Sequence, residues 1–349
     1  MKSLSLLFLI VLISHLQSVY SASLRKNVSE KAGRLKEQLR SLKIEKPFEH
    51  FRTFEEIERD LKKWAKTHPE LITLGVIGQT YHKRNIYSFS IADNDCGENK
   101  PAVLIECGMH AREWVSPAIC FHMINELLDY NSKFSNLLAS FDFHMIPMLN
   151  PDGYVYTWTN DRLWRKNRSP QAKGCVGVDL NRNFDIDFCV AGSETDPCSH
   201  IFCGPKAFSE LESQAFRDYA TQLKQENNLK HSFHIHSYGQ MITYPYGYKA
   251  EATVPNAEKL EQAVYKAAMI IKNLTGTEYT YGQSGKFIYE ASGGGDDWAM
   301  MYLGLESTYC IENQDTGDYG FMLSNRKIKS AASECTEIMT VLLQHFIED

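Results

Sequence analysis

The 349-residue sequence lacks several features that would assign it to a class at once. Its nine cysteines include no Cys-x-x-Cys pair, so they indicate disulfides before metal ligands if the chain is secreted. It has no excess of basic residues: 37 Lys and Arg stand against 43 Asp and Glu, a net charge of -6, so no nucleic-acid or anionic-membrane partner is expected. It has no apolar run of the roughly 20 residues that a membrane span needs, and no internal repeat. These absences leave a globular protein.

The sequence does contain ample material for a buried core, since 43% of its residues are hydrophobic and 12% aromatic. Its N-terminus is typical of a signal peptide, with Lys2, an apolar run from Leu4 to Ile13 and small residues at a suitable cleavage point. We therefore expect residues 1–21 to be a signal peptide and the protein to be secreted and extracellular. Residues 22–47 form a short charged segment, and 48–349 are expected to form one domain. Three Asn-x-Ser/Thr sequons could carry glycan, at Asn27, Asn167 and Asn273.

Strand-like and helix-like segments alternate after residue 48. Thr53 and Glu56 form a capping box, and Ser116-Pro117 and Ser209 predict two further helix starts. Short apolar or β-rich runs predict strands over 102–106, 141–149, 232–236 and 308–312, and helical periodicity covers 256–274 and 327–347. This alternation predicts an α/β fold with a mixed, largely parallel twisted sheet and helices on both faces. Functional residues then gather at the carboxyl ends of the strands.

Two segments suggest a metal site at that edge. His110 and Glu113 form a His-x-x-Glu pair directly after a predicted strand, although a surface polar pair is the usual alternative. His234 and His236 end another predicted strand, and one of them must face the same edge of the sheet. Two imidazoles and one carboxylate give a zinc site with its fourth position open, which is the catalytic pattern. Glu312 ends a further strand and is the candidate acceptor of the proton of a zinc-activated water.

Seven segments of the sequence together resemble one family. In order, they are MHAREW, WRKNRS, CVGVDLNRNF, IHSYGQ, YPYGY, YEASGG and IENQDTGDYGF, and they span roughly 48–349. This pattern is similar to the pancreatic-type carboxypeptidase A/B family of zinc exopeptidases, which cleave the last peptide bond of a chain. The resemblance implies that His110, Glu113 and His236 bind one Zn²⁺ and that His234 is structural.

The same resemblance assigns further roles around the metal. It implies that Glu312 is the general base, that Arg165 polarises the scissile carbonyl and that Asp179 orients a ligand histidine without binding the metal. Three residues are expected to bind the terminal carboxylate of the substrate: Asn181, Arg182 and Tyr289. Three others are expected to contact substrate residues beyond the scissile bond: Arg112, Tyr238 and Phe321.

The expected partners follow from this activity: peptide or protein C-termini as substrates, and proteinaceous carboxypeptidase inhibitors. The resemblance also implies three disulfides, Cys107–Cys120, Cys175–Cys198 and Cys189–Cys203. Cys96, Cys310 and Cys335 then remain, and Cys310–Cys335 is a further candidate pair. Family members usually carry a globular prosegment that covers the site, whereas residues 22–47 are too few for one, so autoinhibition by a folded prodomain is not expected.

The preferred terminal residue depends on the side-chain pocket. Asp296 falls where B-type enzymes place an aspartate at the floor of this pocket, and Gly247 and Ser284 are small residues at its wall. A buried carboxylate facing a long slot favours C-terminal Lys or Arg. The alternatives are that Asp297 takes this place and Asp296 lies at the surface, that the enzyme has A-type specificity for apolar termini, that the chain is a non-catalytic binding protein, or that it is a zinc deacylase of small molecules.

Overall fold

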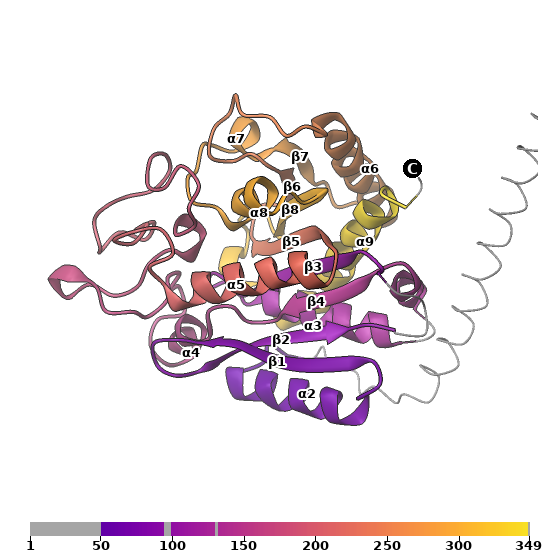
Figure 1. The fold of residues 1–349 in the computed structure, drawn as a ribbon, viewed down its shortest axis with the longest axis horizontal. Coiled ribbons are helices and arrows are strands. Elements are labelled where there is room, and N and C mark those ends of the chain that lie inside the picture. Colours follow the sequence, from indigo (N-terminus) through magenta and orange to yellow (C-terminus); the bar gives the residue numbers. More distant parts are fainter. Residues whose placement is uncertain (1–49, 94–98, 130–131, 348–349) are drawn as a thin grey trace, which may run out of the picture.

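The computed structural model describes residues 50–93, 99–129 and 132–347, which pack around one twisted sheet of eight strands (Figure 1). The strand order is β1-β2-β4-β3-β5-β8-β6-β7. The strands are β1 Ile72–Gln79, β2 Asn85–Ile91, β3 Ala102–Cys107, β4 Asp142–Ile146, β5 Leu229–Ser237, β6 Met241–Tyr244, β7 Thr280–Gln283 and β8 Ser307–Asn313. The four central strands β4, β3, β5 and β8 are parallel, while β1, β2 and β6 join by antiparallel pairs. The predicted mixed, largely parallel sheet is confirmed.

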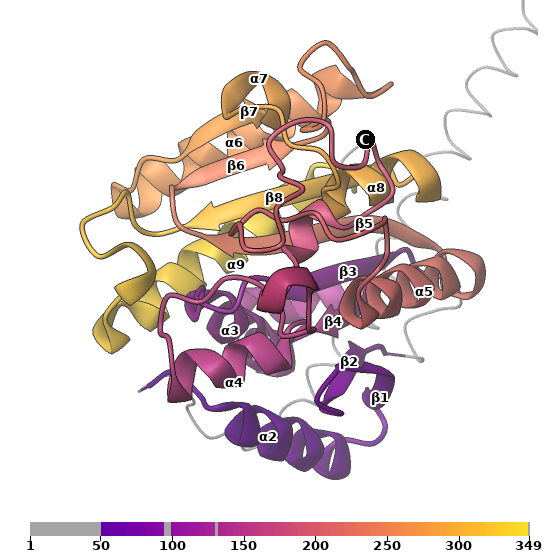
Figure 2. The ribbon, with the colours of Figure 1, turned by 90° about the vertical axis from the view of Figure 1, so that its left-hand side faces the viewer.

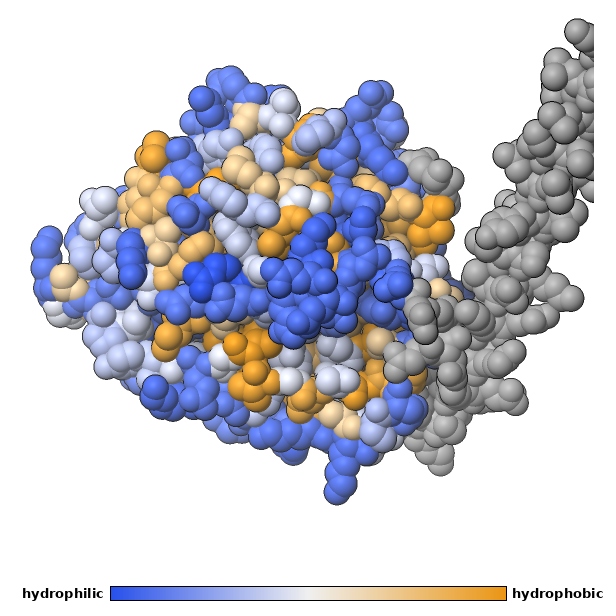
Figure 3. Space-filling view, viewed as in Figure 1, coloured by the Kyte–Doolittle hydropathy of each residue, from blue (hydrophilic) through white to orange (hydrophobic). Residues whose placement is uncertain are grey.

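Helices cover both faces of the sheet, as Figures 1 and 2 show. The α-helices are α2 Phe54–Thr67, α3 Val115–Leu128, α4 Pro151–Thr159, α5 Leu211–Glu226, α6 Ala257–Thr275, α7 Ser284–Phe287, α8 Gly295–Leu303 and α9 Ile328–Gln344. Helices α3, α6 and α9 pack together on one face, and α5 and α8 lie on the other. In Figure 3 the outward side of α5 is hydrophilic, as expected for a helix that buries one face only. No helix in the described ranges is long and apolar enough to cross a membrane.

Local sequence sets the helix ends with varying success. The Thr53 hydroxyl accepts from the Glu56 N–H and the Glu56 carboxylate accepts from the Thr53 N–H, so the predicted capping box is confirmed. The predicted start at Ser116 is wrong, because α3 begins at Val115 and the Ser116 hydroxyl is used elsewhere, donating to the Ile235 carbonyl and accepting from the Gly108 N–H. Tertiary hydrogen bonds here outweigh the local cap.

The third predicted helix start is displaced for a similar reason. Helix α5 begins at Leu211 after Glu210, and the Ser209 hydroxyl donates to the Glu210 carboxylate instead of capping the helix. Short 3₁₀ turns, η4 Leu180–Arg182 and η5 Gly320–Met322, lie in the loops that surround the site.

The cysteines pair only in part as expected. The Cys175–Cys198 and Cys189–Cys203 disulfides are present. The predicted Cys107–Cys120 bridge is wrong, because both are buried free thiols, hydrogen-bonded to one another. Burial raises the pKa of the Cys107 thiol well above its ordinary value. The second candidate pair, Cys310–Cys335, is also unbonded, and Cys96 lies outside the described residues.

The two sequons within the described residues differ sharply in exposure. Asn167 is fully buried, and its amide donates to the carboxylates of Glu210 and Glu212 at 2.7 and 2.9 Å. The folded protein therefore offers no glycan acceptor at Asn167, so this candidate is wrong for the native state. Asn273 is exposed in the last turn of α6. The sequon at Asn27, the expected signal peptide and the charged segment 22–47 lie outside the described residues.

Candidate active site

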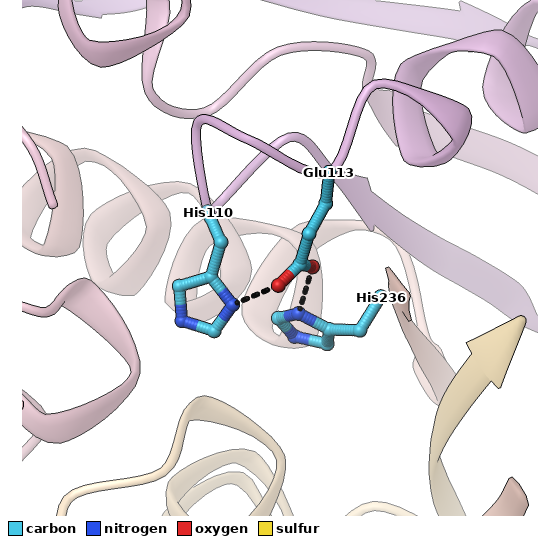
Figure 4. A group of neighbouring side chains, drawn as sticks. All are labelled: His110, Glu113 and His236. Atoms are coloured by element: carbon cyan, nitrogen blue, oxygen red, sulfur yellow. Dashed lines mark hydrogen bonds and ion pairs between the residues drawn. The ribbon is translucent and has the colours of Figure 1, made fainter. Parts of the chain in front are cut away.

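The three expected metal ligands converge in the fold (Figure 4). The carboxylate oxygens of Glu113 lie 2.9 Å from Nδ1 of His110 and 2.9 Å from Nδ1 of His236. One ligand atom from each residue lies within 4.8 Å of the others, and all three side chains are buried. In the described ranges this is the one cluster of His, Cys, Asp and Glu with such spacing. Two imidazole nitrogens and a carboxylate match the donor set of a catalytic zinc site.

The sheet explains why ligands so distant in sequence meet. His110 follows β3 by a sharp turn at Gly108, which has φ +72 and would clash with Met148 if it carried a Cβ. His236 lies near the carboxyl end of β5, and strand pairing places it beside Glu312 of β8. Because β3, β5 and β8 are parallel, their carboxyl ends share one edge of the sheet, as predicted.

Neighbouring groups act on the ligand side chains. Burial alone would raise the pKa of Glu113, but the positive charges of His110 and His236 hold it well below its usual range. Asp179 accepts a hydrogen bond from Nε2 of His110 at 3.0 Å, so Nδ1 is left to face the metal site. Arg165 in turn donates from Nε to Asp179 at 2.9 Å, and its Nη1 lies 3.8 Å from Glu113. Asp179 thus lies where a group orienting a ligand histidine should.

Glu312 faces the same space with an unpaired oxygen. Its Oε2 is buried and has no hydrogen-bond partner in the part of the chain described. Burial and the negative charge of Glu113 raise the pKa of Glu312 to about 7, against the opposing charges of His236 and the two arginines Arg165 and Arg112. A carboxylate with a pKa near neutrality is suited to exchange protons.

The cluster opens into a cavity of about 460 Å³ that contains every predicted substrate-binding residue. Its lining includes the terminal-carboxylate group, Asn181, Arg182 and Tyr289, and the outer group, Arg112, Tyr238 and Phe321. Arg182 Nη2 donates to the Tyr289 hydroxyl at 3.3 Å, whereas the Tyr289 ring is 57% exposed at the mouth. The sequence reasoning therefore identified residues of a single cavity.

The two adjacent aspartates play different parts. Asp297 is fully buried and accepts hydrogen bonds from the backbone N–H groups of Gly247 and Tyr248, at 2.8 and 2.7 Å. Asp296 is half-buried and lines the cavity, and none of the described residues donates a hydrogen bond to its carboxylate. Asp297 is therefore held by the fold, while Asp296 remains open to a ligand.

Comparison with known proteins identifies the family. The family model described as zinc carboxypeptidase matches residues 57–338. The chain belongs to the zinc carboxypeptidase family. Carboxypeptidase B of Rattus norvegicus is 42% identical over 291 residues, covering 81% of this chain and 68% of the relative. Carboxypeptidase B of Astacus astacus is 35% identical over 301 residues, covering 86% of this chain and 97% of the relative. Carboxypeptidase A2 of Rattus norvegicus is 37% identical over 305 residues, covering 85% of this chain and 70% of the relative.

Solved structures agree with this assignment. Bovine thrombin-activatable fibrinolysis inhibitor in complex with tick carboxypeptidase inhibitor superposes with a TM-score of 0.79 at 34% identity, covering 86% of this chain and 99% of that one. Carboxypeptidase A from Helicoverpa armigera gives a TM-score of 0.80 at 30% identity, covering 92% and 80%. The protein is thus a zinc metallocarboxypeptidase, a peptide hydrolase, and it uses zinc. The alternatives of a binding protein and of a small-molecule deacylase are set aside.

Sequence reasoning missed some residues of the carboxypeptidase cavity. Cys310 lines it, because it lies two residues before Glu312 on β8 and successive residues of a strand alternate between faces. That period-two rule would have placed Cys310 on the same face of the strand as Glu312. The Ser237 N–H donates to Glu113 at 3.2 Å, a backbone contact that no residue type could reveal.

Replacing His236 with Ala should remove the metal, because it deletes one of the three donors. The measured zinc content of purified protein should fall from about one ion per chain to near zero. His234→Gln is the matched control: His234 is buried on the same strand, but its nearest acidic atom is Glu106 Oε2 at 3.5 Å. This control should keep its zinc. Loss of zinc from both variants, or from the control alone, would contradict the ligand assignment.

Proposed function

We propose that this metallocarboxypeptidase is secreted and removes C-terminal Lys or Arg from peptides. The observation that carries the specificity is the Asp296 carboxylate, which faces the cavity with no described hydrogen-bond donor. A carboxylate that faces the cavity is stabilised by a ligand that brings a positive charge, and an apolar terminus would leave it unpaired. The similarity to carboxypeptidase B enzymes supports the same specificity.

The cavity is suited to a chain end rather than an internal peptide bond. Arg182 is buried and its guanidinium donates to the carbonyls of Gly192 and Asn181, each at 2.7 Å, which fixes its position. A fixed guanidinium fork, with the amide of Asn181 beside it, suits the two oxygens of a terminal carboxylate. Tyr289 at the mouth can add its hydroxyl. Only the last residue of a peptide offers the charge that completes this arrangement.

Glu312 and Arg165 carry the proton transfer and the charge stabilisation in this proposal. Zinc held by His110, Glu113 and His236 would supply a Lewis acid and lower the pKa of a bound water. Glu312 accepts a proton from the attacking water through its unpaired Oε2 and passes it to the leaving amine. Arg165, held by Asp179, stabilises the negative charge that develops on the scissile carbonyl oxygen.

Secretion and partners follow from the remaining observations. The signal-peptide pattern of residues 1–21 supports export, and the two disulfides are typical of an oxidising compartment. Because the bovine relative was solved with a tick carboxypeptidase inhibitor, we expect the cleft of this enzyme to accept proteinaceous inhibitors as well.

Glu312→Gln should keep zinc and reduce kcat by roughly 10²–10⁴-fold, since it removes the proton acceptor and leaves the ligands in place. Steady-state rates on a substrate ending in Arg, with zinc content measured in parallel, test this. Glu306→Gln is the control, because Glu306 directly precedes the same strand and pairs with Lys230 at the surface. Near-normal turnover by the Glu312 variant would require another base.

The ratio of activities on matched substrates ending in Arg and in Phe tests the specificity. The native enzyme should prefer the substrate that ends in Arg. Asp296→Asn should lower kcat/KM for that substrate by at least about 30-fold, while kcat/KM for the substrate that ends in Phe changes by only a few-fold. A native preference for Phe would overturn the role of Asp296 and restore A-type specificity.

The pH profile of kcat/KM should show an acidic limb that follows Glu312. The base acts only when ionised, so activity is present above its pKa and is lost as the pH falls through it. The raised pKa of about 7 would place the midpoint of this limb near neutrality. A bound zinc cation would shift the midpoint to lower pH, because the positive charge stabilises the carboxylate. Rates measured between about pH 5 and pH 8, with zinc retention checked at each pH, test this. A flat profile over that range would contradict it.

A further inference from the structure

Arg162 lies outside the groups described so far, but it links two residues of the outer group. Its Nη1 donates to the carbonyl of Arg112 at 2.7 Å, and its Nη2 donates to the carbonyl of Phe321. These carbonyls belong to segments 50 and 159 residues away in the chain. One side chain therefore joins the loop that follows β3 to the turn η5.

The guanidinium itself rests on a rigid base. Its Cζ lies 3.7 Å from the centre of the Trp114 ring, and Trp114 directly follows the metal ligand Glu113. The Trp114 ring stacks on Trp158 at 4.0 Å, and its Nε1 donates to Thr157 at 2.8 Å. Arg162 is thus fixed by an aromatic stack as well as by its two hydrogen bonds.

The two joined segments form the outer wall of the cavity. The Arg112 guanidinium lies 4.0 Å above the Phe321 ring, and the Tyr238 ring packs edge-on against Phe321 at 4.9 Å. All three side chains line the cavity. Their relative positions depend on the spacing between the backbones of residues 112 and 321, which Arg162 bridges.

The chemistry at this bridge requires arginine. No carboxylate in the described ranges forms an ion pair with Arg162, so its N–H groups donate to carbonyls instead. Burial lowers the pKa of Arg162 to about 10, and the guanidinium therefore remains charged near neutral pH. A planar fork satisfies two carbonyls at a fixed separation, whereas a single ammonium group does not hold the same geometry.

We propose that Arg162 is a positioning residue that sets the wall contacted by the substrate residues preceding the scissile bond. It acts through Arg112, Tyr238 and Phe321 and touches neither the metal ligands nor Glu312. The inference rests on the proposed function, because it takes this wall as the site for residues beyond the scissile bond. Longer peptides then depend on Arg162, while substrates too short to reach the wall do not.

The test compares Arg162→Met with Arg162→Lys and the native enzyme on two substrates. One is an N-blocked dipeptide ending in Arg, and the other is an unblocked pentapeptide with the same last two residues. Arg162→Met should lower kcat/KM for the pentapeptide by about tenfold, mainly through KM, while changing the dipeptide by less than about twofold. The kcat/KM of Arg162→Lys for the pentapeptide should lie between those of Arg162→Met and the native enzyme. Backbone hydrogen exchange over residues 315–322 should be faster in Arg162→Met than in the native enzyme.

Arg168→Met is the matched control. Arg168 also stacks on aromatic rings, 3.6 Å from Tyr156 and 4.4 Å from Trp164, but it bridges no part of the cavity wall. The control should leave the ratio of the kcat/KM values for the two substrates unchanged. An equal fall in the kcat/KM of Arg162→Met for both substrates, or no change for either, would overturn the positioning role. Failure of the native enzyme to cleave either substrate would instead refute the proposed function.

Discussion

The buried Glu113 carboxylate lies between two imidazoles at the base of the cavity, and the groups around it keep it there. A buried negative charge is costly unless partners surround it, and here His110, His236 and the Ser237 N–H all contact it. Arg165 adds a positive charge at 3.8 Å. His236 and Ser237 come from β5, His110 from the turn after β3 and Arg165 from a loop, so the metal site forms only when these separate segments have come together.

The sheet makes this convergence reliable. Parallel pairing of β5 with β8 places His236 beside Glu312 by register alone, without any contact between loops. Residues outside the sheet line the rest of the cavity, and two of them are held by hydrogen bonds to backbone atoms. Arg182 contacts carbonyls of its own loop, and Asp297 contacts two N–H groups of the opposite wall. His236 and Glu312 thus lie on strands, whereas Arg182 lies in a loop that hydrogen bonds hold in place.

The sequence predicted the central strands and a metal site because their signals are local or periodic, and the family resemblance then selected His236 rather than His234. Strand runs ending in His or Glu, and a His-x-x-Glu pair after a strand, are visible in one dimension. The starts of α3 and α5 were misplaced because Ser116 and Ser209 bond to distant or unexpected partners rather than to the helix. Arg162 and Cys310 were missed because their roles depend on what lies opposite them in space. The same is true of the buried amide of Asn167, which a sequon alone presents as a surface group.

The division of labour between Asp297 and Asp296 has a consequence for the cavity. Asp297 ties the pocket wall to the first turn of α8, so the neighbouring position 296 is relieved of any structural duty. Exchange of the charge at 296 for an apolar side chain would leave these hydrogen bonds of Asp297 intact, so the lining of the cavity can change without loss of its wall.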